Sequence, residues 1–484
     1  VVRGLSDRYT SSSLNGAVIP SADAEKQAAQ LDLIPANMIQ RLDVRKTFTP
    51  DMPGGFAGGS VNIITKSYPD QFTFNFSAGA SYNANSNLRD DFAGSTRGSD
   101  DWLAIDDGTR EIPADLVSLY EAIDASGGSV TVTFNGRQFT QRGITRGFIQ
   151  NLDNGGNFNL LWNALIGEDG EVRLAKILNT VEPLQDFGPV ESSSPMNGNF
   201  KLSFGDNYKI LGRESGFFAG INYGRSFWMT QERQAQRFTP RAGAGGAPAL
   251  DRDQHLFVTN GVANVTWAAN FTTGIKPSEG HELAFNYSRV QAADDTRASL
   301  FYDVHQANIQ QKEAQSQYTE RSLQNFQILG RHEFNELADL RLEWITSIAG
   351  VSQEDPNVAI YQTRIDPVDG EFRALSNTEP ETPTRLWRDI EESNFNNRVD
   401  FDQPYQIRER EGEISFGAYQ SVSSRQYRED GFRVENDATL LFNDGVVPTA
   451  SIDGINSIAA SDYDDDRKIE AVYGMAEVPV TDWW

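Results

Sequence analysis

The stretch QFTFNFSAGASYN, Gln71–Asn83, decides the fold. Its even positions from 72 to 82 read Phe, Phe, Phe, Ala, Ala and Tyr, and the odd positions between them are small or polar. Strict alternation places apolar side chains on one face of a β-strand and polar ones on the other. Strands of soluble proteins usually run about 5–6 residues, whereas a strand that crosses a membrane needs about 9–11. The length of this stretch therefore predicts a strand of a transmembrane β-barrel.

The same alternation returns along the rest of the chain. In 199–205, for example, Phe200, Leu202 and Phe204 alternate with polar neighbours. Counting such segments gives roughly ten strands. The others lie at 216–228, 264–275, 281–289, 340–348, 413–422 and 469–480. The repeated pattern predicts a membrane protein of the all-β class, built on one large antiparallel sheet.

The connections between these segments are of two lengths. Very few residues join two pairs of segments, at 276–280 and at 335–338. The long connections lie near 85–195, 229–255, 291–320, 351–383 and 425–467. Short turns on one rim and long loops on the other are typical of transmembrane barrels. We therefore expect the long connections to be extracellular loops.

Composition limits the possible partners and cofactors. The chain has 484 residues and a formal net charge of −26, which would repel nucleic acid. It contains no cysteine, which excludes zinc ribbons and disulfide scaffolds, and its four histidines lack the spacing of metal ligands. No run approaches the ~18 apolar residues of a membrane helix. We expect no metal site and no cofactor, with weak binding of divalent cations by the acidic loops left open.

The first part of the chain does not carry the alternating pattern. Within 31–47 the sequence predicts a short helix over Ala36–Gln40, followed by a strand over Arg41–Lys46. The segment GGSVNIITK, 58–66, predicts another strand. We therefore divide the chain into a small α+β domain, residues 1–69, and a β-domain, residues 70–484.

Several motifs together resemble one protein family. VRGL at 2–5, the Asn-Gly pair at 15–16, IPANMIQRLDV at 34–44 and GGFAGGSVNIIT at 54–65 follow one another in the order and at the spacing found in one domain of that family. They resemble the C-terminal part of the plug of TonB-dependent outer-membrane receptors. Residues 412–430 and 471–484 are similar to mid-barrel strands of such receptors, and WLAIDDGTREIP, 102–113, is similar to their long first extracellular insertion.

The resemblance implies a large antiparallel barrel of about 22 strands when complete, with the α+β domain as a plug in its lumen. Because roughly ten strands are counted and half a barrel would expose unpaired edges in lipid, we expect the chain to be a partial copy. The implied function is TonB-dependent active import of a scarce nutrient across the bacterial outer membrane. Substrate would be bound by extracellular loops and by the plug apices, and no enzymatic activity is expected.

The implied location is the outer membrane of a Gram-negative bacterium. The implied partners are the TonB complex of the inner membrane, outer-membrane lipid and lipopolysaccharide, and a small-molecule or oligosaccharide substrate such as a siderophore or a carbohydrate. A surface lipoprotein stays open as a further partner. Two other functions also stay open, namely a passive porin or adhesin-type barrel and a soluble glycan-binding β-protein.

The resemblance also suggests which residues of the first domain form a functional site. Arg8, Tyr9, Ser21 and Asp23 fall in or near loops that face the vestibule in the family, so they are candidates for substrate contacts. Arginine can clamp a carboxylate or phosphate, and tyrosine can stack on a sugar ring. An equally weighted alternative is that these turn residues only hold the plug against the barrel wall. Two other arginines, Arg3 and Arg41, are candidates for ion pairs between plug and barrel.

A cluster of glycines precedes the strand at 58–66. Gly54, Gly55, Gly58 and Gly59 resemble a phosphate-binding loop in composition. Such a loop is followed by a helix, and here the β-branched run SVNIIT follows instead. We therefore interpret these glycines as structural, because they permit close backbone packing.

Carboxylate clusters are the remaining candidates for chemistry. DYDDDRK, 462–468, begins like a calcium loop but lacks the required glycine and glutamate. The adjacent acid pairs Asp90-Asp91, Asp100-Asp101 and Glu391-Glu392 are interpreted as solvated charge. No serine or histidine carries the context of a nucleophile.

Overall fold

The structure is a computed structural model that describes most of the chain. The described residues are 10–22, 34, 38–52, 58–96, 98–112, 114–134, 136–142, 164–165, 188–242, 248–304, 309–365, 372–374, 384–407, 410–436, 452–457 and 462–478.

A small four-stranded sheet forms from the N-terminal part of the chain. Its order is β2-β1-β4-β3, with β1 and β4 parallel and the other pairs antiparallel. Asn15 and Gly16 join the first two strands with φ angles of 52° and 93°, which asparagine and glycine tolerate better than other residues. The strands are β1 (Thr10–Leu14), β2 (Ala17–Val18), β3 (Ile39–Arg45) and β4 (Gly59–Thr65).

The predicted helix over Ala36–Gln40 is wrong at its C-terminal end. Ile39 and Gln40 already belong to strand β3, which ends at Arg45 instead of Lys46. Pairing with β4 explains the early start, because Ile39 lies opposite Thr65 at the end of that ladder. Tertiary pairing thus overrides a weak local helix preference.

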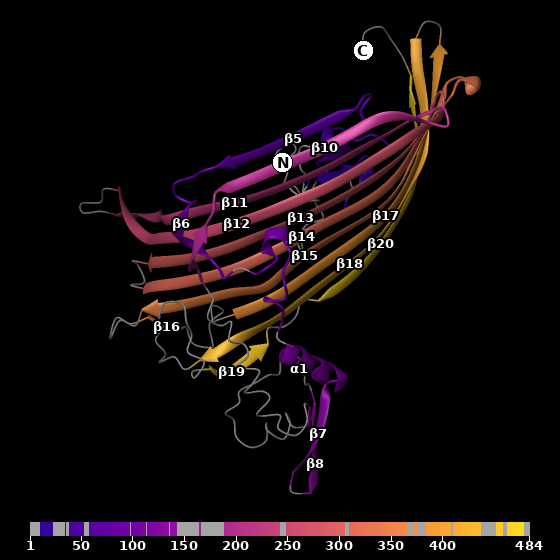
Figure 1. Ribbon diagram of the computed structural model, residues 1–484. Coiled ribbons are helices and arrows are strands. Elements are labelled where there is room, and N and C mark those ends of the chain that lie inside the picture. Colours follow the sequence, from indigo (N-terminus) through magenta and orange to yellow (C-terminus); the bar gives the residue numbers. More distant parts are fainter. Residues whose placement is uncertain are drawn as a thin grey trace.

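A large antiparallel sheet of twelve strands contains most of the described residues (Figure 1). Its order is β19-β18-β17-β15-β14-β13-β12-β11-β10-β5, with β16 beside β15 and β20 beside β18. The strands are β5 (Thr73–Ser81), β10 (Asn197–Ile210), β11 (Arg213–Ala242), β12 (Pro248–Ser278), β13 (His281–Val304), β14 (Ile309–Phe334), β15 (Leu340–Ile365), β16 (Phe372–Ala374), β17 (Thr384–Ile407), β18 (Arg410–Asn436), β19 (Ile452–Ser457) and β20 (Tyr463–Glu477). The predicted all-β class and large antiparallel sheet are confirmed.

Most of the predicted long loops are wrong, because the strands continue through them. The expected loops at 229–255 and 291–320 are largely strand, since β11 reaches Ala242 and β13 reaches Val304. The regions 351–383 and 425–467 likewise contain the ends of β15 and β18. Their polar side chains resemble loop composition, because a strand that is polar on both faces has no apolar alternation to reveal it.

The predicted loop at 85–195 also contains regular structure. Strands β6 (Arg89–Gly94) and β9 (Val190–Ser194) pair with each other, and β7 (Ser129–Phe134) pairs with β8 (Arg137–Arg142). A short 3-10 helix, η4 (Asp101–Leu103), and helix α1 (Ala114–Ala125) lie between them, and a second 3-10 helix, η8 (Asn335–Leu337), makes the short turn after β14. Among the described residues, no helix is both long and apolar enough to cross a membrane.

One face of the large sheet, here called the outer face, carries a continuous apolar row. The row follows the strand register, so neighbouring members lie directly opposite each other. Phe326, Ile348 and Phe395 are 43%, 57% and 38% exposed. The row runs Phe74, Phe204, Ala219, Phe271, Tyr287, Phe326, Ile348, Phe395, Val422 and Lys468. Nine of its ten members are therefore apolar or aromatic.

The opposite, inner face is polar at the same level. Its equivalent row runs Asn75, Ser203, Gly220, Asn270, Ser288, Asn325, Ala349, Asn394, Ser423 and Arg467. The small sheet packs against this inner face through a buried apolar cluster. That cluster joins Leu14, Ile19, Ala22, Ile34, Met38 and Ile63 to Ala268, Val290, Ala292, Leu323 and Val351.

Candidate functional site

The Asn15-Gly16 turn of the small sheet is held by one glutamine of the large sheet. Asn15 Nδ2 donates to Gln327 Oε1 at 2.7 Å, and Gln327 Nε2 donates to the carbonyl oxygen of Leu14 at 2.8 Å. Asn15 also donates to Thr65 Oγ1 at 3.0 Å. Gln327 is 1% exposed, so this reciprocal contact fixes the position of the turn in a water-free environment.

A buried ion pair holds the chain that follows β2. Arg425 Nη1 lies 2.9 Å from Glu392 Oε2, and both side chains are 9% exposed. Ser21 completes the contact, because its amide donates to Glu392 Oε2 at 3.3 Å and its carbonyl accepts from Arg425 Nη1 at 3.1 Å. Removing one partner of such a pair leaves a buried uncompensated charge. The Ser21–Glu392–Arg425 contact is therefore a strong link between the two sheets.

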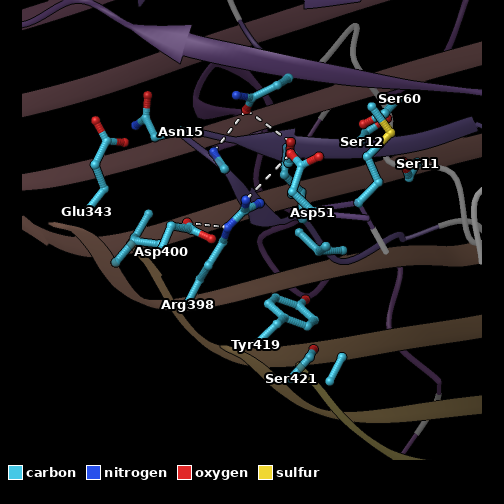
Figure 2. Close-up of a pocket in the computed structure, with 18 of the residues that line it drawn as sticks. Ser11, Ser12, Asn15, Asp51, Ser60, Glu343, Arg398, Asp400, Tyr419 and Ser421 are labelled. Carbon is cyan, nitrogen blue, oxygen red and sulfur yellow. Dashed lines mark hydrogen bonds and ion pairs between the residues drawn. The ribbon is translucent and has the colours of Figure 1, made fainter. Parts of the chain in front are cut away.

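A second ionic contact lies beside a cavity of about 610 Å³ between the two sheets (Figure 2). Asp51 accepts from Arg45 at 2.8 Å and lies 3.8 Å from Arg398. Arg398 in turn donates to Asp400 at 2.6 Å. Burial raises the pKa of Asp51, but the hydrogen bond from Thr49 and the cations of Arg45 and Arg398 outweigh it and hold that pKa below its usual value.

The cavity is lined by both sheets. The small sheet contributes hydroxyl and amide groups, and the large sheet contributes aromatic and charged groups, including Tyr419 and Glu343. Figure 2 shows the Arg398 and Tyr419 side chains rising from the large sheet toward the small one. The space gives the small sheet room to shift without first displacing close-packed side chains on this side.

Farther along the inner face, away from the short turns, polar side chains form a connected track. Arg321 donates to Asp294 at 2.9 Å and, through Nε, to Gln353 at 2.9 Å. Asp355 accepts from Gln353 Nε2 at 3.3 Å and from Thr319 Oγ1 at 2.6 Å. These side chains belong to β13, β14 and β15, and the register places them on the face that the small sheet covers. The track offers hydrogen-bonding groups and charges of both signs to a polar solute.

The predicted extracellular insertion, 102–113, lies in a segment that packs against the outer face. We call the described residues of 83–112 the strap. Trp267 Nε1 donates to the carbonyl of Leu103 at 2.7 Å, and Gln291 Nε2 donates to that of Ala104 at 2.8 Å. The register puts Trp267 and Gln291 on the same face as Phe271 and Tyr287. The strap is thus on the opposite side of the large sheet from the small sheet.

An arginine forms the centre of the strap. Arg110 is 6% exposed and pairs with Asp101 at 2.8 Å and Asp106 at 2.6 Å. Its guanidinium lies 4.1 Å from the centre of the Tyr318 ring, and its carbonyl accepts from Trp387 Nε1 at 2.8 Å. Burial opposes the charge, but the two carboxylates prevail and raise the pKa of Arg110 above its ordinary value. The motif at 102–113 therefore encodes a folded, charge-compensated element.

Of the nominated substrate contacts, the structure describes only Ser21. It is 1% exposed and contacts the large sheet, as the alternative reading of these turn residues expected. Arg8, Tyr9 and Asp23 lie outside the described residues, as do Arg3, Gly54 and Gly55.

Arg41 does not form the expected contact with the other domain in the described structure. Its Nε donates to Asp43 at 3.1 Å on the same strand, and the pair is largely exposed. The period of two explains this, because Arg41 and Asp43 share one face of β3. Gly58 and Gly59 are buried, and Gly59 lies opposite Thr10 in the parallel ladder, consistent with close backbone packing.

Sequence reasoning missed several functional contacts. The prediction that the pair Glu391-Glu392 is solvated charge is wrong for Glu392, which is buried, whereas Glu391 is exposed. Adjacent residues of a strand lie on opposite faces. The alternation of faces along the strand was therefore the signal that only one of these two glutamates is exposed. The histidines were judged far apart, but His281 and His332 lie opposite each other with their Nδ1 atoms 3.0 Å apart.

No group of three metal-ligating side chains occurs among the described residues. Within DYDDDRK, Asp464 pairs with Arg428 at 2.8 Å, and Asp462 accepts the Glu429 amide at 3.0 Å. Comparison of the chain with models of known protein families and with curated proteins found no match.

Proposed function

We propose that this protein is a TonB-dependent transporter that imports a scarce nutrient across the bacterial outer membrane. In this proposal the large sheet is part of the wall of a transmembrane barrel, and the small sheet is part of its plug. The observation that carries the proposal is the opposition of the two faces. The apolar row lies on one face, and the small sheet docks on the other.

The outer row supports a membrane location. Phenylalanine and isoleucine side chains at this exposure would be costly in water, and a contiguous exposed apolar surface marks a site of interaction. In lipid the same side chains are favourable, and the continuous antiparallel ladder satisfies the backbone hydrogen bonds of the strands. Alternation between an apolar and a polar face is the pattern of barrels with a polar interior.

The docking of the small sheet supports a gated transporter over a passive porin. Two buried links, Asn15–Gln327 and Ser21–Glu392–Arg425, hold the small sheet on the inner face. The links involve few side chains, and the adjacent cavity leaves space for movement. A pull from the TonB complex, driven by the proton-motive force, would have to break these polar links and also separate the buried apolar cluster between the two sheets to open a path. The energy-coupled mechanism itself rests on the family resemblance.

The polar track on the inner face supports a polar cargo. Arg321, Asp294 and Gln353 present donors and acceptors at the level beyond the small sheet. Such groups suit a metal chelate or an oligosaccharide, which expose many hydroxyl or carboxylate oxygens. We assign the substrate to this polar class, bound between the track and the loops beyond it.

The experiment uses the absence of cysteine from residues 1–484. In the full-length protein, Asn15→Cys and Gln327→Cys are joined by a short reducible thiol cross-linker in a deletion strain. We expect uptake from a panel of ferric chelates, cobalamin and oligosaccharides to stop on cross-linking and to recover on reduction. The single variants with the same reagent are the controls. Uptake of every panel member by the deletion strain itself would refute the transport proposal, and uptake unaffected by cross-linking would favour a passive channel.

A further inference from the structure

A second hollow, of about 680 Å³, lies on the outer face of the large sheet. Ten of its twelve lining residues belong to this face by register, and the other two, Val351 and Glu392, are their neighbours in the strands. The ten are Ser322, Gln324, Gly350, Ser352, Glu391, Ser393, Ser424, Gln426, Asp464 and Asp466. Glu392 also lines the cavity under the small sheet, but the ten residues place this hollow on the opposite face of the large sheet.

The position of the hollow relative to the apolar row is fixed by the register. Gln324, Gly350 and Ser393 lie two residues beyond Phe326, Ile348 and Phe395 respectively, or about 7 Å along each strand. On the opposite side of the hollow, the strap contacts the outer face, where the Asp106 amide donates to Glu320 at 2.8 Å. The hollow thus lies between the apolar row and the strap. If the row faces lipid, the hollow faces the headgroups.

The lining has the chemistry of a sugar site. It presents four serine hydroxyls, two glutamine amides and several carboxylates, and no lysine or arginine is among the lining residues. Hydroxyls and amides donate and accept, and carboxylates accept strong hydrogen bonds from hydroxyl groups. Asp464 is paired with Arg428, and the remaining carboxylates, Glu391 and Asp466 among them, would repel a phosphate. Ser322 and Ser352 share a hydrogen bond of 2.8 Å, so the positions of these two lining hydroxyls are fixed relative to each other.

We infer that this hollow binds the uncharged saccharide headgroup of a glycolipid, with the acyl chains lying on Ile348, Phe395 and Val422. The inference rests on the proposed membrane location, since only a membrane would deliver both parts of the ligand together. It concerns the outer wall, and it is independent of what the transporter carries through its interior. The strap contacts the outer face at Glu320, on the side of the hollow away from the acyl chains.

Gly350 allows a direct test. A Cβ added there meets no atom within 4 Å, so a side chain can start at this position, and we expect Gly350→Tyr to occupy the hollow. Gly474 is the matched control, because it lies on the same face opposite Phe416, is equally open and lines neither cavity. Each protein is placed in bilayers containing equal amounts of digalactosyl diacylglycerol and phosphatidylglycerol, and retained lipid is counted by native mass spectrometry.

We expect the unmodified protein and Gly474→Tyr to retain the galactolipid in preference to phosphatidylglycerol. Retention by Gly350→Tyr should fall by at least about tenfold. Equal retention of both lipids by the unmodified protein would overturn the sugar assignment, and undiminished retention by Gly350→Tyr would overturn the site. If Gly350→Tyr does not fold, the double variant Ser352→Ala with Ser393→Ala replaces it, with the same expected direction. Failure of the unmodified protein to enter bilayers, measured by flotation, is a separate result that refutes the membrane proposal.

Discussion

At the scale of single residues, neighbours in the sequence have opposite roles. Glu392 is buried against Arg425 on the inner face, whereas Glu391 lines the hollow on the outer face. Asp43 on β3 and Asp51 in the turn beyond that strand also differ, since Asp51 is 14% exposed and Asp43 is 39% exposed. The charge of a residue therefore says little about its role until the face it occupies is known.

Asp51 provides a prediction with a pH dependence. Its pKa is lowered in the folded state, so its contribution to stability is present above the unfolded value of about 3.8 and is lost as the pH falls through the folded value. Asp51→Asn should weaken docking of the small sheet by about 1–3 kcal/mol at pH 7, measured by hydrogen exchange of β1 and β4. The stability of the Asp51→Asn variant should also fall less on acidification than that of the unmodified protein, because residue 51 no longer titrates.

Asp43→Asn is the control for that experiment. The Arg41–Asp43 pair is exposed to solvent, and such pairs contribute roughly 0–1 kcal/mol. We expect exchange in Asp43→Asn to match the unmodified protein. Equal effects of the two substitutions would mean that Asp51 has no special role in docking.

At the scale of elements, the strands are longer and the connections shorter than the sequence predicts. The alternation located β5, β10 and the middle of β12, because one face there is apolar. It failed beyond residue 229 of β11, where both faces are polar and the ladder with β12 alone maintains the strand. Pairing across strands is a long-range property that a local pattern does not report.

The strap is an element whose folding depends on one side chain. Arg110→Met would leave Asp101 and Asp106 uncompensated in a buried site, at a cost of about 3–5 kcal/mol. We expect the variant to release 98–112 from the outer face, and limited proteolysis should then cleave this region while the large sheet stays intact.

Arg89→Met is the matched control in the same strap. Arg89 pairs with Asp91 at the surface, with 27% and 49% of the two side chains exposed. Its loss should leave the protease pattern unchanged. Protection of 98–112 in Arg110→Met equal to that in Arg89→Met would show that the ionic centre does not hold the strap.

At the scale of the whole molecule, the small sheet and the apolar row lie on opposite faces of the large sheet. Because the chain has no cysteine, single cysteines report each face separately. We expect Phe395→Cys in lipid bilayers to be quenched by a lipid-borne label and protected from a water-soluble thiol reagent. Its neighbour Asn394→Cys, 2% exposed as asparagine, should be protected from both while the small sheet is docked. Lipid quenching at both positions, or water access at Phe395→Cys, would contradict the assignment of faces.

The sequence by itself determined the all-β class and the short turns, because each depends on neighbours a few residues apart. The resemblance made Ser21 a candidate for substrate contact, whereas the structure buries it against Glu392 and Arg425. Only the tertiary structure decided that Glu392 and Arg425 hold Ser21, that Asp51 meets Arg398, and that the motif at 102–113 folds around Arg110 on the outer face. These contacts join residues up to 404 positions apart. Their partners are chosen by strand register and by the docking of one sheet on another, and no local period encodes either.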